Sequence, residues 1–146
     1  METPMLAQTL YTTSATATGG REGRAVSQDG LLDVALSTPK ELGGAGGEGT
    51  NPEQMFAAGY AACFLSALKF IAMQQKIALP SDAEVTTSVG IGPRKDEPGF
   101  ALEVGLKVAL PGVDRDVAEK LVALAHETCP YSNATRGALD ITPVLA

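Results

Sequence analysis

The chain has 146 residues and a mass of 15.0 kDa, the size of one ordinary domain. Hydrophobic residues make up 45% of it, enough for a core that needs no disulfide. Eleven basic residues against seventeen acidic ones give a net charge of −6, and the chain has no basic stripe, so nucleic acid is excluded as an expected partner. We therefore expect a single domain over residues 1–146.

Neither the N-terminus nor the longest apolar stretch has the pattern of a targeting or membrane segment. The first twenty residues have no basic start and no apolar run of signal-peptide length. The apolar stretch from Met55 to Leu68 is interrupted by Gly, Tyr and Ser and falls short of the roughly 20 residues that a membrane span needs. We expect a cytoplasmic protein with no membrane partner, in which this stretch is a buried helix.

The N-terminal third has the pattern of three short strands. Leu6–Thr18, Arg24–Gln28 and Leu31–Ser37 read as strands and are separated by two glycine-containing turns. This pattern predicts a three-stranded meander. The next segment, Glu41–Thr50, has five glycines in ten residues, which predicts a mobile loop.

A long helix is predicted after that loop. Asn51 is a good N-cap, Pro52 suits the first helical position, and Gln54 can reach back to complete a capping box. Apolar residues lie nearly all round the helix as far as Leu68, which is typical of a helix enclosed by other layers. We expect the helix to run from Pro52 to about Lys76.

The C-terminal half predicts a second hairpin, a second helix and a last strand. Glu84–Gly92 and Phe100–Leu110 have the pattern of two strands around a turn. Asp114 caps a helix with one apolar face, and Pro130 ends that helix. The last strand is expected over Ala138–Leu145.

The order β-β-β-α-β-β-α-β predicts an α+β fold in which antiparallel sheets pack around two central helices. Two helices cannot cover both faces of six strands, and one of the helices is apolar nearly all round. We therefore expect a second subunit to supply the missing cover, in an intertwined homodimer. A compact monomer with one solvated sheet face is the alternative.

Metal chemistry is not expected from the residues present. The two cysteines, Cys63 and Cys129, form neither a CxxC pair nor a zinc-ligand cluster, and the one histidine, His126, cannot complete a four-ligand site with them. His126 lies near the end of the second predicted helix, where a capping or surface role is favoured over catalysis. We expect no metal and no cofactor.

Cys63 lies in the middle of the first predicted helix among Ala, Phe and Leu, where a free cysteine is most often a small buried hydrophobe. Burial would raise its pKa, and even an ordinary pKa of about 8.5 leaves only about 3% thiolate at neutral pH. A reactive Cys63 therefore needs a cation nearby. The candidate arginines are Arg21, Arg24, Arg94, Arg115 and Arg136.

Arg21 and Glu53 are the candidates for a supporting pair. Arg21 lies in GGREGR at the tip of a predicted hairpin, where glycines allow a sharp turn that can aim its side chain at a helix. Glu53 lies in the first turn of the helix that holds Cys63 and could orient a guanidinium through a bidentate pair. Simpler explanations stay open, namely a solvated turn charge for Arg21 and stabilisation by the helix dipole for Glu53.

Cys129 precedes a helix-ending proline, where a thiol can move, whereas Cys63 is held in the middle of a helix. A fixed attacking thiol and a movable resolving thiol suit disulfide chemistry. The alternative is a permanent disulfide, which would stabilise the fold by roughly 4 kcal/mol through the lost loop entropy of the unfolded chain. A cytoplasmic domain with an ample core neither needs such a bond nor readily keeps it oxidised, so redox use is favoured.

Three segments of the chain, TGGREGRAVSQDG, GTNPEQMFAAGYAACF and ETCPYSNATRG, resemble the organic hydroperoxide resistance (Ohr) branch of the Ohr/OsmC family. The resemblance follows nearly the whole chain in order, although Ala138 stands where Ohr proteins often have Asn. It implies a thiol-dependent peroxidase that reduces organic hydroperoxides to alcohols. The apolar surroundings of Cys63, with Phe56 and Phe64 nearby in sequence, favour fatty-acid or aryl hydroperoxides over hydrogen peroxide. By the same resemblance Cys63 is the peroxidatic residue, Cys129 resolves it, Arg21 stabilises the thiolate and Glu53 holds that arginine.

The resemblance also implies a reaction sequence and partners. A Cys63 sulfenic acid would give a Cys63–Cys129 disulfide, which dihydrolipoyl groups of lipoylated proteins would reduce in preference to thioredoxin. A domain-swapped homodimer would hold two active sites at the subunit interface. The alternatives are a peroxidase of the OsmC branch with a broader substrate range and a non-catalytic module that binds a lipid-like ligand in the apolar interior.

Overall fold

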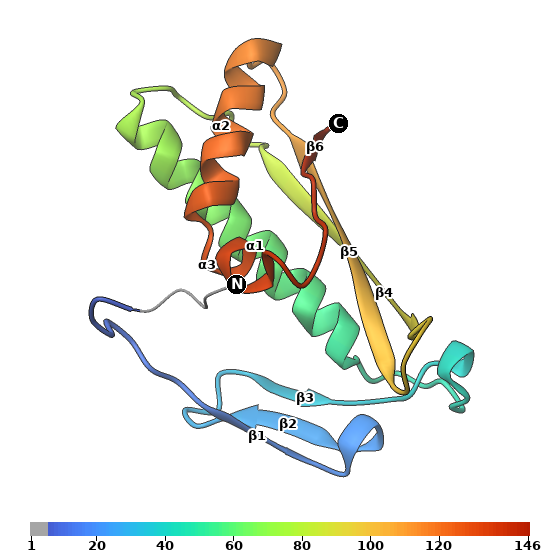
Figure 1. Cartoon of the computed structure of the whole chain (residues 1–146). Coiled ribbons are helices and arrows are strands. Elements are labelled where there is room, and N and C mark those ends of the chain that lie inside the picture. The colour runs from blue at the N-terminus through green and yellow to red at the C-terminus, as the bar shows by residue number, and fades with distance from the viewer. Residues whose placement is uncertain (1–5) are drawn as a thin grey trace. The chain divides into compact units, whose positions relative to one another are not determined.

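The computed structural model describes residues 6–146, which form two compact units, residues 6–55 and Phe56–Ala146. Its helices and strands appear in Figure 1. In chain order they are β1 (Ala15–Thr18), β2 (Arg24–Ser27), β3 (Asp33–Ala35), α1 (Pro52–Gln74), β4 (Glu84–Pro93), β5 (Phe100–Ala109), α2 (Arg115–Thr128), α3 (Pro130–Thr135) and β6 (Val144–Leu145), with short 3₁₀ turns at Gly20–Glu22 and Lys40–Leu42. The order confirms the predicted α+β class and adds one helix, α3.

The first unit contains the predicted meander. β1, β2 and β3 pair antiparallel in the order of the chain, with Ala15 opposite Ser27 and Arg24 opposite Ala35. The prediction of a first strand from Leu6 was wrong, because β1 begins only at Ala15. The four residues of β2 pair with the four residues of β1, and one further hydrogen bond beyond them joins Gln28 N–H to the carbonyl of Ser14 at 2.9 Å.

The glycine-rich segment after β3 returns to the end of that strand. Thr50 N–H donates to the carbonyl of Ala35 at 2.9 Å, and Thr50 forms a parallel bridge with Leu36. A Cβ atom on Gly49 would lie 2.5 Å from the backbone of Leu36, so this return needs a residue without a side chain. The segment predicted as a mobile loop therefore has a fixed end next to α1.

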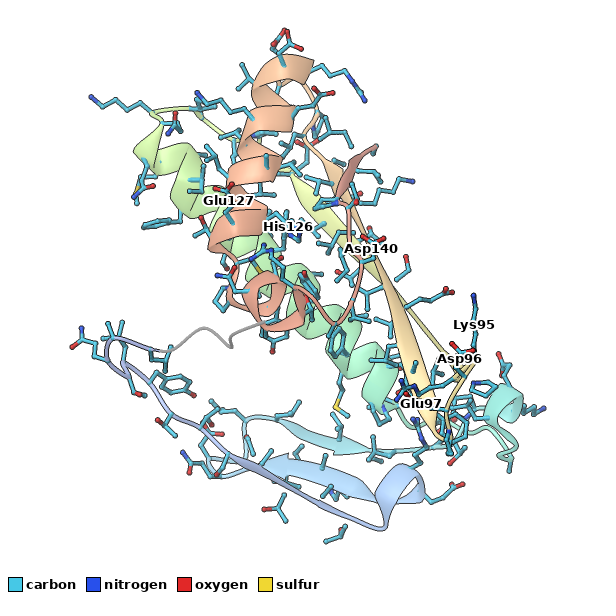
Figure 2. All side chains as sticks on the ribbon, in the orientation of Figure 1. Lys95, Asp96, Glu97, His126, Glu127 and Asp140 are labelled. Carbon is cyan, nitrogen blue, oxygen red and sulfur yellow. The ribbon has the colours of Figure 1, made fainter. Side chains whose placement is uncertain are left out.

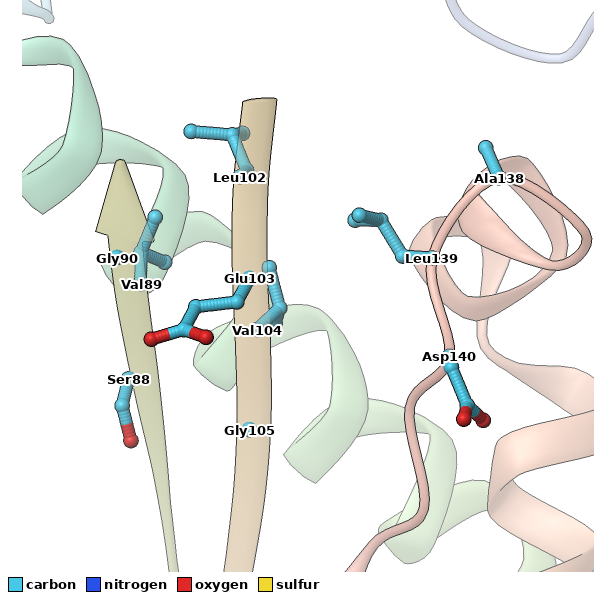
Figure 3. Close-up of a pocket in the computed structure, with 10 residues that line it drawn as sticks. All are labelled: Ser88, Val89, Gly90, Leu102, Glu103, Val104, Gly105, Ala138, Leu139 and Asp140. Carbon is cyan, nitrogen blue, oxygen red and sulfur yellow. The ribbon is translucent and has the colours of Figure 1, made fainter. Parts of the chain in front are cut away.

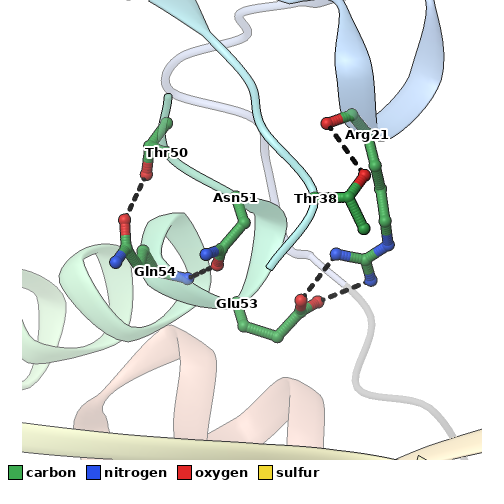
Figure 4. Close-up of polar contacts among 6 residues, drawn as sticks. All are labelled: Arg21, Thr38, Thr50, Asn51, Glu53 and Gln54. Carbon is green, nitrogen blue, oxygen red and sulfur yellow. Dashed lines mark hydrogen bonds and ion pairs between the residues drawn. The ribbon is translucent and has the colours of Figure 1, made fainter. Parts of the chain in front are cut away.

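The N-terminus of α1 has the predicted cap. Asn51 Oδ1 accepts a hydrogen bond from Gln54 N–H at 2.8 Å. The reciprocal half of the predicted capping box was wrong, since Gln54 Oε1 instead accepts from the Thr50 hydroxyl at 2.7 Å (Figure 4).

The C-terminus of α1 closes around a residue in the left-handed region. α1 ends at Gln74, slightly before the predicted end, because Lys76 has a φ of 57°. Ile77 N–H donates to the carbonyl of Ala72 at 2.8 Å, the bond that characterises a Schellman closure. Such closures usually have glycine where this chain has Lys76.

α1 is slightly shorter than predicted, and one of its faces stays apolar to near its end. It has 23 residues, and an 18-residue stretch of it has a mean hydropathy of 1.6, which is long and apolar enough to cross a membrane by length and composition, a test that core helices of soluble proteins also pass. Buried Ile71 and Ala72 continue one apolar face beyond Leu68, where the surface that is apolar nearly all round was expected to end. Phe70 and Met73 on the same helix are exposed.

The second unit is built on the predicted second hairpin. β4 and β5 pair antiparallel over ten residues each, from Glu84 opposite Ala109 to Pro93 opposite Phe100. β6 is only two residues long, so the prediction of a strand that begins at Ala138 was wrong. β6 also runs parallel to β5, so the prediction of wholly antiparallel sheets was wrong as well. Most of the segment after α3 is irregular and only its end pairs with β5 (dark red in Figure 1).

α2 starts and ends as predicted, but the proline after it begins another helix. The Asp114 carboxylate accepts from Val117 N–H at 3.4 Å and caps α2. Pro130 is at the start of α3, where its missing N–H would have no helical partner anyway. Pro130 therefore ends α2 and at the same time begins a second helix. Cys129 is the extended joint between the two helices, with φ −63° and ψ 123°.

The core of the second unit lies among α1, α2 and the β4–β5 hairpin (Figure 1). Its largest fully buried side chains are Tyr60, Phe64, Leu68, Leu106, Val108, Leu121, Cys129 and Ser132. Helices packed on a sheet agree with the predicted layering. One cysteine and one serine lie in this otherwise apolar set.

Candidate active site

The structure brings the two cysteines together inside the second unit. Cys63 lies in the middle of α1 and Cys129 at the joint of α2 and α3, and their sulfurs are 3.6 Å apart. Both are free thiols. Cys129 is fully buried whereas Cys63 is partly exposed, so a reagent from solvent meets Cys63 first.

The surroundings of Cys63 in this unit favour its neutral form. Burial raises the pKa of the Cys63 thiol, and the adjacent Cys129 adds to the rise. The backbone N–H of Tyr131 donates to the Cys63 sulfur and lowers the pKa, but by less than burial raises it. A nucleophilic Cys63 therefore needs positive charge from a further group.

Arg21 and Glu53, both in the first unit, form a bidentate ion pair (Figure 4). Arg21 Nη1 and Nη2 donate to the two oxygens of Glu53 at 2.7 and 3.0 Å. The two parallel hydrogen bonds fix the plane of the guanidinium. The hydrogen bond from Arg21 lowers the pKa of Glu53, so the pair stays charged at neutral pH.

Local backbone geometry presents Arg21 to Glu53. Arg21 lies in a 3₁₀ turn between Gly19, at φ 72°, and Gly23. A Cβ on Gly23 would lie 1.7 Å from the Thr18 carbonyl oxygen, so the turn can close only with glycine there. This is the sharp turn that the GGREGR sequence predicted.

The other four arginines have partners of their own. Arg24, Arg94 and Arg115 form exposed ion pairs with Asp33, Glu97 and Glu119. Exposed pairs of this kind contribute little to stability. Arg136 donates to the carbonyl of His126 at 2.7 Å and also bonds Asn133.

His126 belongs to a buried hydrogen-bonded chain that the sequence analysis missed. Its Nδ1 lies 2.8 Å from Ser132 Oγ, and the same oxygen lies 2.7 Å from the hydroxyl of Tyr60. His126 lies in the last turn of α2, near the helix end where a capping or surface role was expected, and its side chain is partly buried (Figure 2). Burial lowers the pKa of His126, and the charge of Arg136 lowers it further, so the ring is neutral at pH 7.

Three aromatic rings from α1 and α3 form a cluster in the structure. Phe56, Tyr60 and Tyr131 pack edge to face or tilted, with ring centroids 5.7 to 6.4 Å apart. A Cβ on Gly59 would meet the Tyr131 hydroxyl at 3.2 Å, so this glycine leaves room for the ring. Tyr60 is fully buried, whereas Phe56 and Tyr131 reach the surface and present apolar area to solvent.

The second unit also has a hollow of about 690 Å³ that neither cysteine lines. β4, β5 and residues 138–140 form its walls (Figure 3). Glu103 and Asp140 both border it, and their carboxylates make it acidic. Among residues 6–146 no three His, Cys, Asp or Glu side chains gather as a metal site would require.

Comparison with known proteins places the chain in a family. The sequence model described as OsmC-like protein matches residues 44–144. The organic hydroperoxide resistance protein of Xanthomonas axonopodis pv. citri (strain 306) is 60% identical over 94% of this chain and 95% of its own length.

Solved structures give the same result. An organic hydroperoxide resistance protein from Legionella pneumophila superposes with a TM-score of 0.88 at 49% identity, covering 95% of this chain and 99% of its own. A putative one from Vibrio cholerae, with captopril bound in one of its active sites, has a TM-score of 0.89 at 48% identity over 95% and 94%. The chain therefore belongs to the Ohr/OsmC family, in its organic hydroperoxide resistance branch.

Proposed function

We propose that the protein is a cysteine-based peroxidase that reduces organic hydroperoxides to alcohols and so provides resistance to them. The observation that carries this proposal is the 3.6 Å contact between a reachable and a buried sulfur, Cys63 and Cys129. The names of its relatives supply the substrate class.

The reaction has two steps on the protein. The Cys63 thiolate attacks the distal oxygen of the hydroperoxide, the O–O bond breaks, and the alkoxide takes a proton and leaves as the alcohol. Cys63 is then a sulfenic acid. The Cys129 sulfur attacks the Cys63 sulfur, water leaves with the sulfenic oxygen, and a Cys63–Cys129 disulfide remains. A dithiol restores the two thiols.

Arg21 has the role of holding Cys63 as a thiolate and stabilising the departing alkoxide. The chemistry requires such a cation because burial and Cys129 both raise the pKa of Cys63. Glu53 fixes the guanidinium through the bidentate pair and keeps its plane constant. The guanidinium could come from the same chain or from a second subunit.

The substrates are fatty-acid or aryl hydroperoxides in preference to hydrogen peroxide. The rings of Phe56 and Tyr131, which both reach the surface, support this, because apolar walls gain free energy by burying a hydrocarbon tail. Hydrogen peroxide has no tail to bury.

A homodimer and a dihydrolipoyl reductant complete the proposal. The apolar side chains of Phe70 and Met73 on α1 are 46% and 69% exposed. Their exposure supports a second subunit that covers them in an intertwined dimer. The chain would act as a single domain in the cytoplasm, and lipoylated proteins or dihydrolipoamide would reduce its disulfide.

A peroxidase assay with two reductants and two oxidants tests the proposal. Cumene hydroperoxide and hydrogen peroxide are each supplied with dihydrolipoamide or with thioredoxin. We expect turnover with cumene hydroperoxide and dihydrolipoamide to exceed every other combination at least tenfold. Equal rates with the two oxidants would favour the OsmC-branch alternative. No turnover in any combination would favour the lipid-binding alternative.

A further inference from the structure

α3 is held in place by one buried polar side chain and by the packing of the Tyr131 ring against Phe56 and Tyr60. In this helix, all of which the structure describes, Ser132 is the one buried residue. Tyr131 is 41% exposed, and Pro130 and Ala134 also face solvent. A six-residue helix is too short to be stable by itself in water. Its position therefore depends on contacts with α1 and α2, and the hydrogen bonds of Ser132 are the buried part of those contacts.

Ser132 ties three helices together. Its hydroxyl lies within hydrogen-bonding distance of Tyr60 on α1 and of His126 on α2. When the hydrogen of the neutral His126 ring is on Nε2, Nδ1 is an acceptor toward the Ser132 hydroxyl. In this arrangement Tyr60 donates to Ser132 and Ser132 donates to His126, so every member of the chain is satisfied.

This chain of hydrogen bonds runs beside the two cysteines. Tyr60 precedes Cys63 by three residues on α1 and so lies on the same face of that helix. His126 precedes Cys129 by three residues and Ser132 follows it by three, so their contact bridges the joint that Cys129 occupies.

We propose that Tyr60, Ser132 and His126 are positioning residues that form a latch, which holds α3 and hence Cys129 in sulfur contact with Cys63. The latch sets the rate at which Cys129 resolves Cys63, and it leaves the first attack on peroxide unaffected. The effect of the latch on the resolving step rests on the proposed peroxidase function, whereas the positioning of Cys129 beside Cys63 does not.

The physical reason is the geometry of the second step. Attack by one sulfur on another is fast when the reacting atoms are already near contact distance and aligned. The 3.6 Å separation between the two sulfurs meets this condition. The backbone of Cys129 is extended between α2 and α3, while its N–H donates to Ala125 and its carbonyl accepts from Asn133, so the place of its sulfur follows the place of both helices. Without the latch, α3 samples other positions, and the fraction of molecules with Cys129 ready to attack falls.

A chromogenic disulfide reagent measures this positioning without any peroxide. Dithiobis(nitrobenzoate) reacts first at the reachable Cys63, which displaces one coloured thiolate and forms a mixed disulfide. Cys129 then attacks the Cys63 sulfur and displaces the second coloured thiolate. The first release reports on Cys63, and the second reports on the position of Cys129.

The test compares Ser132→Ala and Tyr60→Phe with the matched control Thr135→Val. Thr135 donates only to carbonyls inside α3, those of Tyr131 and Ser132, so its removal leaves the latch intact. We expect both latch variants to slow the second release at least tenfold and to change the first less than twofold. The control should change neither. His126→Asn, whose amide can stand near the position of Nδ1, should retain more of the second rate than His126→Ala.

A second release at the wild-type rate in both Ser132→Ala and Tyr60→Phe would overturn the latch. Tyr60→Phe changes one atom, so its fold can be verified by circular dichroism before the rates are read. In the peroxide arm, mass spectrometry should find Cys63 sulfinic acid in Ser132→Ala at hydroperoxide concentrations that leave the wild type as a disulfide. If the wild type forms no disulfide with hydroperoxide but the reagent arm behaves as expected, the proposed function fails and the latch stands.

Discussion

The sulfurs of Cys63 and Cys129 lie 3.6 Å apart although 66 residues separate them in the chain. A disulfide bond is about 2.05 Å long, so about 1.5 Å of sulfur movement would close it. A change this small is compatible with a joint between two helices. The following predictions test the roles that this contact suggests.

The two cysteines should differ in the step that each supports. Cys63→Ser should abolish turnover of hydroperoxide, because no nucleophile of comparable strength is left. Cys129→Ser should complete one turnover and stop at Cys63 sulfenic acid, since the resolving sulfur is missing. Stoichiometric consumption of hydroperoxide, with mass spectrometry of Cys63, measures this. Sustained wild-type turnover in Cys129→Ser would remove the resolving role.

Loss of the carboxylate that holds Arg21 should slow peroxide reduction. Glu53→Gln leaves the guanidinium charged but removes the bidentate pair of 2.7 and 3.0 Å, so we expect kcat/KM to fall roughly tenfold or more. Asp33→Asn is the matched control, because Asp33 pairs with Arg24 on the surface of the same unit. Equal effects of the two substitutions would show that Glu53 has no specific role.

The Arg21–Glu53 pair should also stabilise the protein in a pH-dependent way. Arg21 lowers the pKa of Glu53 below its ordinary value, so the stabilisation is fully present above the unfolded pKa of about 4.3. It is lost as the pH falls through the lower folded pKa. At pH 7 the wild type should exceed Glu53→Gln in unfolding free energy by about 1 kcal/mol. Urea titrations should show the difference at pH 7 and its decline below about pH 4.3; a constant difference would contradict the assignment.

Replacing the left-handed residue after α1 should stabilise the protein. Lys76 has a φ of 57°, a conformation that costs a residue with a side chain about 1 kcal/mol relative to glycine. We expect Lys76→Gly to raise the unfolding free energy by up to about 1 kcal/mol. Lys76→Ala removes the same charge but keeps the strain, so it should give no such gain. A greater stability of the alanine variant would contradict this explanation.

Local signals predicted most of the elements but not how far the strands extend. Asn51 and Asp114 cap their helices as expected, because a cap depends on residues within one turn. β1 and β6 are shorter than predicted, because strand length depends on which residues find partners in another segment. The sequence around β6 gave no indication that it would pair parallel to β5.

For the candidate site, the sequence indicated the Arg21–Glu53 ion pair but not the hydrogen bonds of Ser132. The GGREGR turn and the first-turn Glu53 identified an ion pair that the structure contains. Ser132 was missed because Pro130 was interpreted only as the end of α2, although proline is also favoured at the start of a helix. Without α3, nothing in the sequence indicated that His126 would meet Ser132 rather than solvent.

The most direct test of the account is the pH dependence of Cys63 alkylation. The measurement uses Cys129→Ser, so that only one thiol reacts, with and without Arg21→Gln. We predict a midpoint below the ordinary range of a cysteine thiol with Arg21 and a higher midpoint without it, because the guanidinium favours the thiolate. Superimposable curves for the two proteins would show that Arg21 does not hold Cys63 as a thiolate.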